Sequence, residues 1–186
     1  MNYYILEFDD KYNCLIEDDV PFVFEGISMN LGLFYDNLPR IKVKVKEGTI
    51  PNSIPNQRRY LYFDKKILKV LESYDFSMYQ SFDIDVFNEK EKKVNSSHQL
   101  INILNVVQCI DREESVLVVD EEEEDDDLNI EDILHLKLDE SKIDGEVVFR
   151  LGGFETLLVF REDIVKSLED LNCTGMQFIN ANGYKV

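Results

Sequence analysis

The chain has 186 residues, with 38 acidic and 20 basic side chains, and a formal net charge of −18. A chain of this length predicts one domain, or at most two small ones, with a core that needs no metal or disulfide. Hydrophobic residues make up 44% and aromatic residues 11%, which excludes an intrinsically disordered acidic protein. Lys and Arg supply affinity for nucleic acids and anionic membranes, so the acidic balance disfavours both as partners.

The acidity is concentrated in the C-terminal part of the chain. Residues 1–100 hold 16 acidic and 13 basic side chains, whereas residues 101–186 hold 22 and 7. Eight acids are consecutive: Asp120, Glu121, Glu122, Glu123, Glu124, Asp125, Asp126 and Asp127. Like charges this close repel one another, so we expect residues 120–127 to form a solvated, mobile loop.

Three interpretations of this acidic run stay open. It is a solubilising insertion, a lure for a basic partner, or a weak calcium-binding surface. Calcium loops place their oxygen ligands at fixed positions around a turn, and an uninterrupted acidic run has no such spacing.

The N-terminal segment and the cysteines point to a cytoplasmic protein. Residues 1–10 have no basic segment and no long apolar run, so we expect no secretory signal. No stretch approaches the ~20 apolar residues of a membrane span. The three cysteines, Cys14, Cys109 and Cys173, lie far apart in the sequence. An odd number of cysteines without a disulfide framework predicts reduced thiols in a cytosol.

The first half of the chain predicts four strands and one helix. Residues 3–8 and 20–24 are β-prone, and residues 41–46 alternate apolar side chains with Lys, which suits an edge strand. After another short apolar segment, Asp64 is a suitable N-cap for a helix with one apolar face, formed by Ile67, Leu68, Leu71 and Tyr74. Residues 82–87 alternate as a further strand.

The second half predicts more strands and a second helix. The strand candidates are residues 101–110, residues 115–119, a half-buried segment with Leu134, Leu136 and Leu138, a hairpin of residues 146–151 and 156–160 around Gly152-Gly153, and residues 176–179. The helix carries Ile164, Val165, Leu168 and Leu171. The predicted fold class is therefore α+β, a mixed or antiparallel sheet with few helices, in a single domain over residues 1–186.

Two segments resemble each other at a shift of 97 positions. Residues 61–80 fall on residues 158–177 without a gap, and 7 of 20 positions are identical. Two strand-to-helix units share part of this similarity for physical reasons alone. The equal loop lengths favour an internal duplication of residues 61–88 and 158–180, with two similar strand–helix–strand halves.

The sequence predicts no catalytic, cofactor-binding or metal site. His98 and His135 are the only histidines, no metal-ligand spacing is present, and no nucleophile elbow or phosphate-binding glycine motif occurs. We expect His135 to be exposed on a strand and Cys109 to be a core residue, although a Cys–His pair stays open. Asp83 and Asp85 share one face of a strand and could hold a metal, but we favour an outward polar face, which the alternation with Phe82, Ile84 and Val86 explains.

Arg150 lies within an apolar strand, residues 147–151. A buried guanidinium needs a carboxylate or several carbonyl oxygens, and Asp111 is a candidate partner. We favour an internal salt bridge over a ligand-binding role.

Three blocks of the second half resemble the bacterial immunity-protein-eleven family. They are Asn105-Val106-Val107-Gln108-Cys109-Ile110-Asp111 with Ser115, Val148-Phe149-Arg150-Leu151, and Thr174-Gly175-Met176-Gln177-Phe178. The structural motif residues are Asn105, Asp111, Ser115, Phe149, Arg150, Gly175 and Phe178. The chain departs from the family at Arg161-Glu162-Asp163, where a Ser-Glu helix start is usual, and the acidic run looks like an insertion.

The resemblance implies a non-enzymatic immunity protein without a cofactor. Such proteins bind and neutralise a cognate polymorphic toxin domain in the cytoplasm of the producing cell, and no catalytic residue is implied. On this interpretation the acidic run would contact a basic surface of the toxin, although the family itself implies no function for it. Two alternatives stay open: an enzyme using carboxylates or a metal, and an acidic adaptor that mimics nucleic acid. No oligomeric state follows from the sequence.

Overall fold

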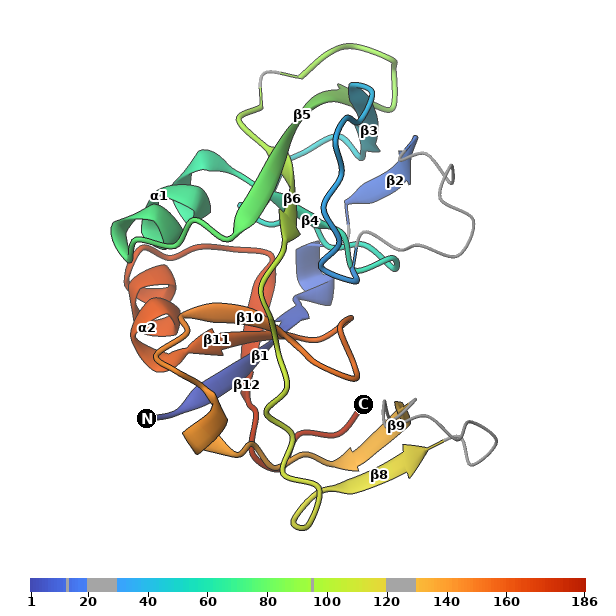
Figure 1. Cartoon of the computed structure of the whole chain (residues 1–186). Coiled ribbons are helices and arrows are strands. Elements are labelled where there is room, and N and C mark those ends of the chain that lie inside the picture. The colour runs from blue at the N-terminus through green and yellow to red at the C-terminus, as the bar shows by residue number, and fades with distance from the viewer. Residues whose placement is uncertain (13, 20–29, 95, 120–129) are drawn as a thin grey trace.

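The computed structural model describes residues 1–12, 14–19, 30–94, 96–119 and 130–186 (Figure 1). The predicted strand over residues 20–24 and the acidic run over residues 120–127 lie outside the described residues. The described strands are β1 (Tyr3–Phe8), β2 (Leu15–Asp18), β3 (Ile41–Val45), β4 (Leu61–Phe63), β5 (Tyr79–Asn88), β6 (Gln99–Ile103), β7 (Val106–Val107), β8 (Val116–Val119), β9 (Ile130–His135), β10 (Val148–Leu151), β11 (Leu158–Arg161) and β12 (Met176–Asn180).

These strands form two five-stranded sheets and a separate two-stranded ribbon. The N-terminal sheet has the order β2-β3-β5-β6-β4, and the C-terminal sheet has the order β12-β1-β11-β10-β7. Neighbours are antiparallel except for the parallel pairs β3–β5 and β10–β7. The ribbon pairs β8 with β9. The mixed sheets and two α-helices confirm the α+β class.

Both predicted helices are present. In α1 (Lys65–Ser73) the carboxylate of Asp64 accepts the backbone N–H groups of Lys66 and Ile67, which is the predicted N-cap. The second helix is α2 (Glu162–Asp170). No helix in the described part of the chain is long and apolar enough to cross a bilayer.

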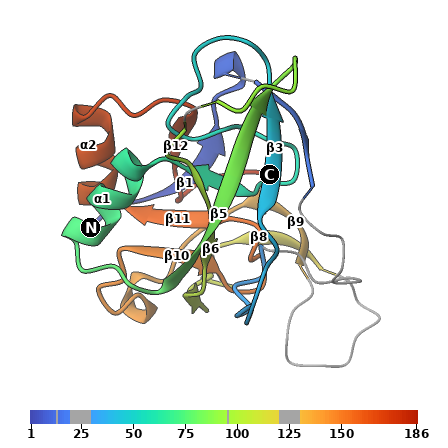
Figure 2. The ribbon, with the colours of Figure 1, turned by 90° about the horizontal axis from the view of Figure 1, so that it is seen from above.

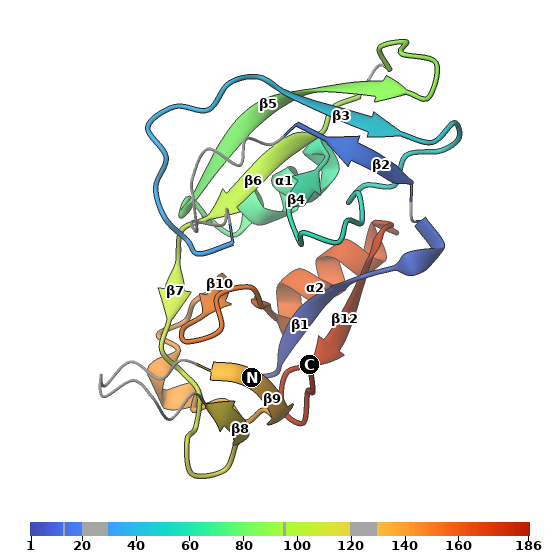
Figure 3. The same ribbon diagram turned by 90° about the vertical axis from the view of Figure 1, so that its right-hand side faces the viewer.

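The helices lie side by side between the two sheets (Figures 2 and 3). Their apolar faces and the inner faces of both sheets form one central core cluster. A second cluster lies on the other face of the N-terminal sheet and contains Ile41, Val43, Tyr62 and Leu100. A third contains Ile5, Phe149 and Val159 of the C-terminal sheet together with the apolar side of the ribbon. The inner and outer faces follow the alternation of side chains along each strand.

Three predicted strands differ from the structure. Residues 41–46 form β3, but β3 lies between β2 and β5 and is not an edge strand. The predicted strand over residues 101–110 is divided into β6 and β7, because the carbonyl of Asn105 accepts the backbone N–H of Arg150 at 2.7 Å instead of continuing β6. The third strand lies earlier than predicted: β9 ends at His135, and Leu134 is exposed, whereas Leu136 and Leu138 are buried beyond its end.

The elements of the two similar segments begin 97 positions apart. This spacing separates the first residues of β4 and β11, of α1 and α2, and of β5 and β12. Each segment is therefore a strand, a nine-residue helix and a strand.

Candidate interaction surface

Two of the motif residues fix the entrance to the β8–β9 ribbon. Oδ1 of Asp111 accepts the backbone N–H groups of Glu113 and Glu114 at 3.0 and 3.1 Å. The hydroxyl of Ser115 donates to the carbonyl oxygen of Lys137 at 3.1 Å and accepts its backbone N–H at 2.9 Å. This side-chain clamp sets the first residue of β8 against the end of β9.

Arg150 is fully buried, with 1% of its surface exposed. Its Nε donates to the carbonyl oxygen of Ile103 at 2.8 Å, and Nη1 donates to that of Glu155 at 2.9 Å. Burial lowers the pKa of Arg150 to about 10, so the side chain stays charged at neutral pH. Asp111, the candidate partner, does not fill this role, because its carboxylate accepts two backbone N–H groups in the turn before β8. Arg150 thus joins three segments of the chain from within.

The other motif residues hold layers of the fold together. The ring of Phe149 meets Tyr3 edge-on at 6.0 Å, and that of Phe178 meets Phe160 at 5.3 Å. Gly175 has φ +88°, and a Cβ there would lie 1.9 Å from the carbonyl oxygen of Ser53. Only glycine allows the C-terminal segment to approach the N-terminal half this closely.

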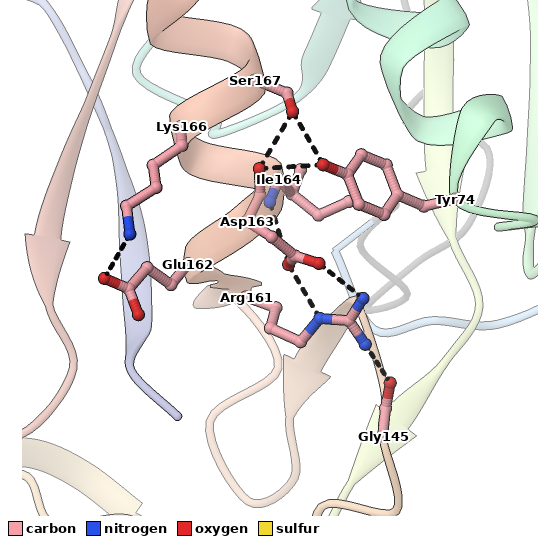
Figure 4. Close-up of polar contacts among 8 residues, drawn as sticks. All are labelled: Tyr74, Gly145, Arg161, Glu162, Asp163, Ile164, Lys166 and Ser167. Atoms are coloured by element: carbon pink, nitrogen blue, oxygen red, sulfur yellow. Dashed lines mark hydrogen bonds and ion pairs between the residues drawn. The ribbon is translucent and has the colours of Figure 1, made fainter.

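Figure 4 shows the polar contacts at the start of α2, where the sequence departs from the family pattern. Arg161 occupies the N-cap position but makes no side-chain cap bond. Its Nε and Nη2 form a bidentate pair with the two carboxylate oxygens of Asp163, both at 2.8 Å, and Nη1 donates to the carbonyl of Gly145. The hydroxyl of Tyr74, just after α1, donates to the carbonyl of Asp163 at 3.0 Å and lies 2.7 Å from Oγ of Ser167. The departing side chains therefore link the start of α2 to the loop at Gly145, whereas Tyr74 ties α1 to α2 through a backbone carbonyl and Ser167.

The described thiols and imidazoles are not arranged as a nucleophile and base. Burial raises the pKa of all three thiols, that of Cys109 to about 12, so none is activated as a thiolate. Cys109 is a buried core residue, as predicted. His98 lies between the carbonyl of Pro51 and the hydroxyl of Ser96, and burial lowers its pKa. His135 is exposed on β9, as predicted.

The Asp83–Asp85 pair is engaged by other side chains. Asp85 forms ion pairs with Arg40 at 2.9 Å and Lys93 at 2.6 Å, which hold the pKa of its carboxyl below the usual range. Asp83 accepts a hydrogen bond from Gln99. Among the described residues, no three His, Cys, Asp or Glu side chains gather as metal ligands would.

The β8–β9 ribbon carries three exposed large apolar side chains. Val116 and Val118 of β8 are 53% and 37% exposed, and Leu134 of β9 is 49% exposed. Glu113 and Glu114 precede β8, and the acidic run separates β8 from β9 in the sequence. Sequence reasoning missed this surface, although an uninterrupted Val-Leu-Val-Val strand between two acidic segments could have indicated it.

One family model matches most of the chain. A family model described as the immunity protein family (Imm11) matches residues 10–183. No curated protein matches the chain.

Proposed function

The chain belongs to the Imm11 family of immunity proteins, and we propose that it binds and neutralises a cognate bacterial toxin domain in the cytoplasm without catalysis of its own. The family match, which spans residues 10–183, carries this proposal. The raised pKa values of the thiols and the ion pairs around Asp85 support a binding role over a catalytic one.

The charge of the chain suggests the chemistry of the partner. A net charge of −18, with eight acids in one run, favours a toxin whose exposed surface is basic. Complementary charge accelerates encounter more than it strengthens the final complex. We propose that the acidic run, residues 120–127, contributes to this encounter.

Co-expression tests the proposal directly. The toxin domain encoded beside this chain should arrest growth when it is expressed alone, and growth should recover when the chain is present. The two proteins should also elute as one complex in size-exclusion chromatography. Continued killing without a complex would contradict the proposal, as would a large, saturable thermal stabilisation by micromolar Mg²⁺, Mn²⁺ or Ca²⁺, which would favour a metal-assisted enzyme.

The role of the acidic run is tested at constant chain length. Replacing every Asp and Glu of residues 120–127 by Asn and Gln should leave the melting temperature unchanged and slow association with the toxin domain. Stopped-flow measurements should show the difference at low ionic strength and lose it as the Debye length shortens to ~3 Å at about 1 M salt.

A control variant neutralises acids elsewhere. Glu169→Gln with Asp170→Asn removes exposed charge at the end of α2, on a different side of the molecule from the ribbon (Figure 1). It should leave the association rate close to that of the natural chain. Equal rates for the natural chain and the run variant at low salt would exclude the encounter role.

A further inference from the structure

The two long edges of the β8–β9 ribbon are unequal. The C-terminal segment, residues 183–186, covers the edge of β9 that faces away from β8. The N–H of Val186 donates to the carbonyl oxygen of Ile133 at 3.0 Å. Just after β9, Leu136 donates to Tyr184 at 2.9 Å and accepts from Gly183 at 2.7 Å. Within the described part of the chain, no strand pairs with the other edge of β8. Figures 1 and 3 both place β8 on the outside of the molecule, with β9 on its inner side.

The ribbon packs on the core through one face, and Val116 and Val118 lie on its other face, opposite His135 and Asp132 of β9. Leu117 and Val119 pack against the same core cluster that holds Ile130 and Ile133 of β9. Val116 and Val118 alternate with them and face solvent. A strand added beside β8 would therefore meet a preformed edge and two exposed β-branched side chains, at little entropic cost to this chain.

This edge lacks the usual protection against pairing. Exposed edge strands are commonly blunted by Lys, Pro or a bulge, and β8 contains neither residue. The extra residues of the two register shifts, Glu131 and Leu134, lie on β9. Glu113 and Glu114, both exposed just before β8, repel a second acidic copy of this chain. The same charges attract a basic segment.

We propose that the open edge of β8 receives an extended segment of the cognate toxin, which pairs with it as an additional strand. This inference rests on the proposed immunity function. Main-chain hydrogen bonds would supply affinity, and the alternating side chains would supply register. The matching segment is apolar where it faces Val116 and Val118 and carries Lys or Arg toward the end that lies beside Glu113 and Glu114.

Substitution of the exposed valines tests the edge. In Val116→Lys/Val118→Lys, two exposed side chains become edge-blocking cations that also repel a basic strand. We expect at least tenfold weaker binding of the toxin domain encoded beside this chain, measured by calorimetry, with a melting temperature close to that of the natural chain. Ile179→Lys is the control: Ile179 is 44% exposed on β12, the edge strand of the C-terminal sheet, and should change affinity less than twofold.

Hydrogen exchange provides a measurement that needs no variant. Amide protons of Val116–Val119 should gain protection when the toxin domain binds to the natural chain. Unchanged affinity of the double-lysine variant, or unchanged protection of β8, would overturn the edge proposal while the immunity function stands. Absence of any complex with the natural chain would remove the immunity function, and the edge proposal with it.

A second inference comes from the strand registers. In the N-terminal sheet β6 lies between β5 and β4, antiparallel to both, and β1 lies between β12 and β11 in the same way. Phe82 pairs with Leu100, and 97 positions later Ile179 pairs with Ile5. If 97 is subtracted from each residue number in β12 and 95 is added to each in β1, all five β12–β1 pairs become the five β5–β6 pairs.

The middle strands also agree in character. At this shift the apolar residues Ile5, Leu6 and Phe8 correspond to Leu100, Ile101 and Ile103, and polar Glu7 corresponds to Asn102. We infer that the chain is a duplication in which each repeat begins with its own middle strand, and that the two repeats have exchanged these strands. β1 completes the sheet of the second repeat, and β6 completes that of the first.

Exchanging the two strands in the full chain tests this inference. One variant interchanges residues 4–8 with residues 99–103. A control variant interchanges residues 41–45 with residues 176–180, two strands that do not correspond in the two repeats. The first variant should keep one cooperative unfolding transition at a lower midpoint, and the control should not fold. Sequences of other family members give a second measurement: their halves should align with β1 on β6. Halves that fail to align in this way would overturn the exchange.

Discussion

His98 is the residue whose environment makes stability depend on pH near neutrality. Nε2 lies 2.7 Å from the carbonyl oxygen of Pro51, which can only accept, so Nε2 carries the proton and Nδ1 accepts from Ser96 at 2.6 Å. Burial lowers the pKa of His98, and the folded protein therefore holds it neutral. In the unfolded chain the same imidazole has a pKa of ~6.5.

The free energy of unfolding should fall as the pH drops below that value, because the unfolded chain binds the proton first. The loss should continue until the pH reaches the lowered pKa of the folded state. Urea titrations between about pH 7.5 and 5.5 measure this slope. His98→Asn should flatten it, whereas His135→Asn, at an exposed position, should not. Equal slopes for the natural chain and His98→Asn would show that another group titrates here.

Arg150 and Asp111 mark the limit of sequence reasoning about single residues. The apolar neighbours of Arg150 were sufficient to predict burial and the need for oxygen partners. They could not identify those partners, because the carbonyls of Ile103 and Glu155 become available only through the paths of two other segments. The sequence shows that Asp111 is an acid near a strand. It does not show that Asp111 accepts backbone N–H groups in a turn, because that depends on the local backbone geometry.

Among the elements, the turn between α2 and β12 fixes how closely the two halves approach. A Cβ at Gly175 would overlap the backbone of Ser53, which cannot move without displacing Thr174, whose carbonyl accepts the Ser53 N–H at 3.0 Å. We expect Gly175→Ala to lower the free energy of unfolding by at least ~3 kcal/mol. Gly145 has φ +73° but open space around its Cβ position, so Gly145→Ala should cost only about 1–2 kcal/mol. Chemical denaturation compares the two, and similar losses would exclude the close approach as the cause.

Elements with strong local signals were predicted well. The Asp64 cap, the alternation of residues 41–46 and the glycine pair between β10 and β11 each combine a turn or cap with a regular apolar period. Strand order, the division of β6 from β7 and the position of β9 depend on partners distant in sequence. The alternation of residues 41–46 could not show that β3 is an inner strand. Lys42 is exposed and Lys44 half-buried on the side of β3 opposite Ile41 and Val43, as they could also be on an edge strand. The exposed edge of β8 could not be predicted either, because it depends on the strand order.

At the scale of the whole molecule, the central core joins both similar segments. Phe63 and Phe160 correspond at the shift of 97 positions, and both are fully buried in this cluster. Phe63→Ala and Phe160→Ala should each lower the free energy of unfolding by about 3–5 kcal/mol. Each should shift a single transition, because neither sheet keeps its inner face covered without the other. Coincident circular dichroism and fluorescence transitions would confirm this, and two separate midpoints would show independent halves.

The position of β1 has a consequence for protein synthesis. β1 is synthesised well before its partners β11 and β12, which follow about 150 residues later in the chain. At roughly 5–20 residues per second, the segment with Ile5 and Leu6 waits on the order of ten seconds without its sheet. During that time its apolar side chains are available to chaperones, and the C-terminal sheet is incomplete. The C-terminal sheet can thus be completed only after translation has reached β12.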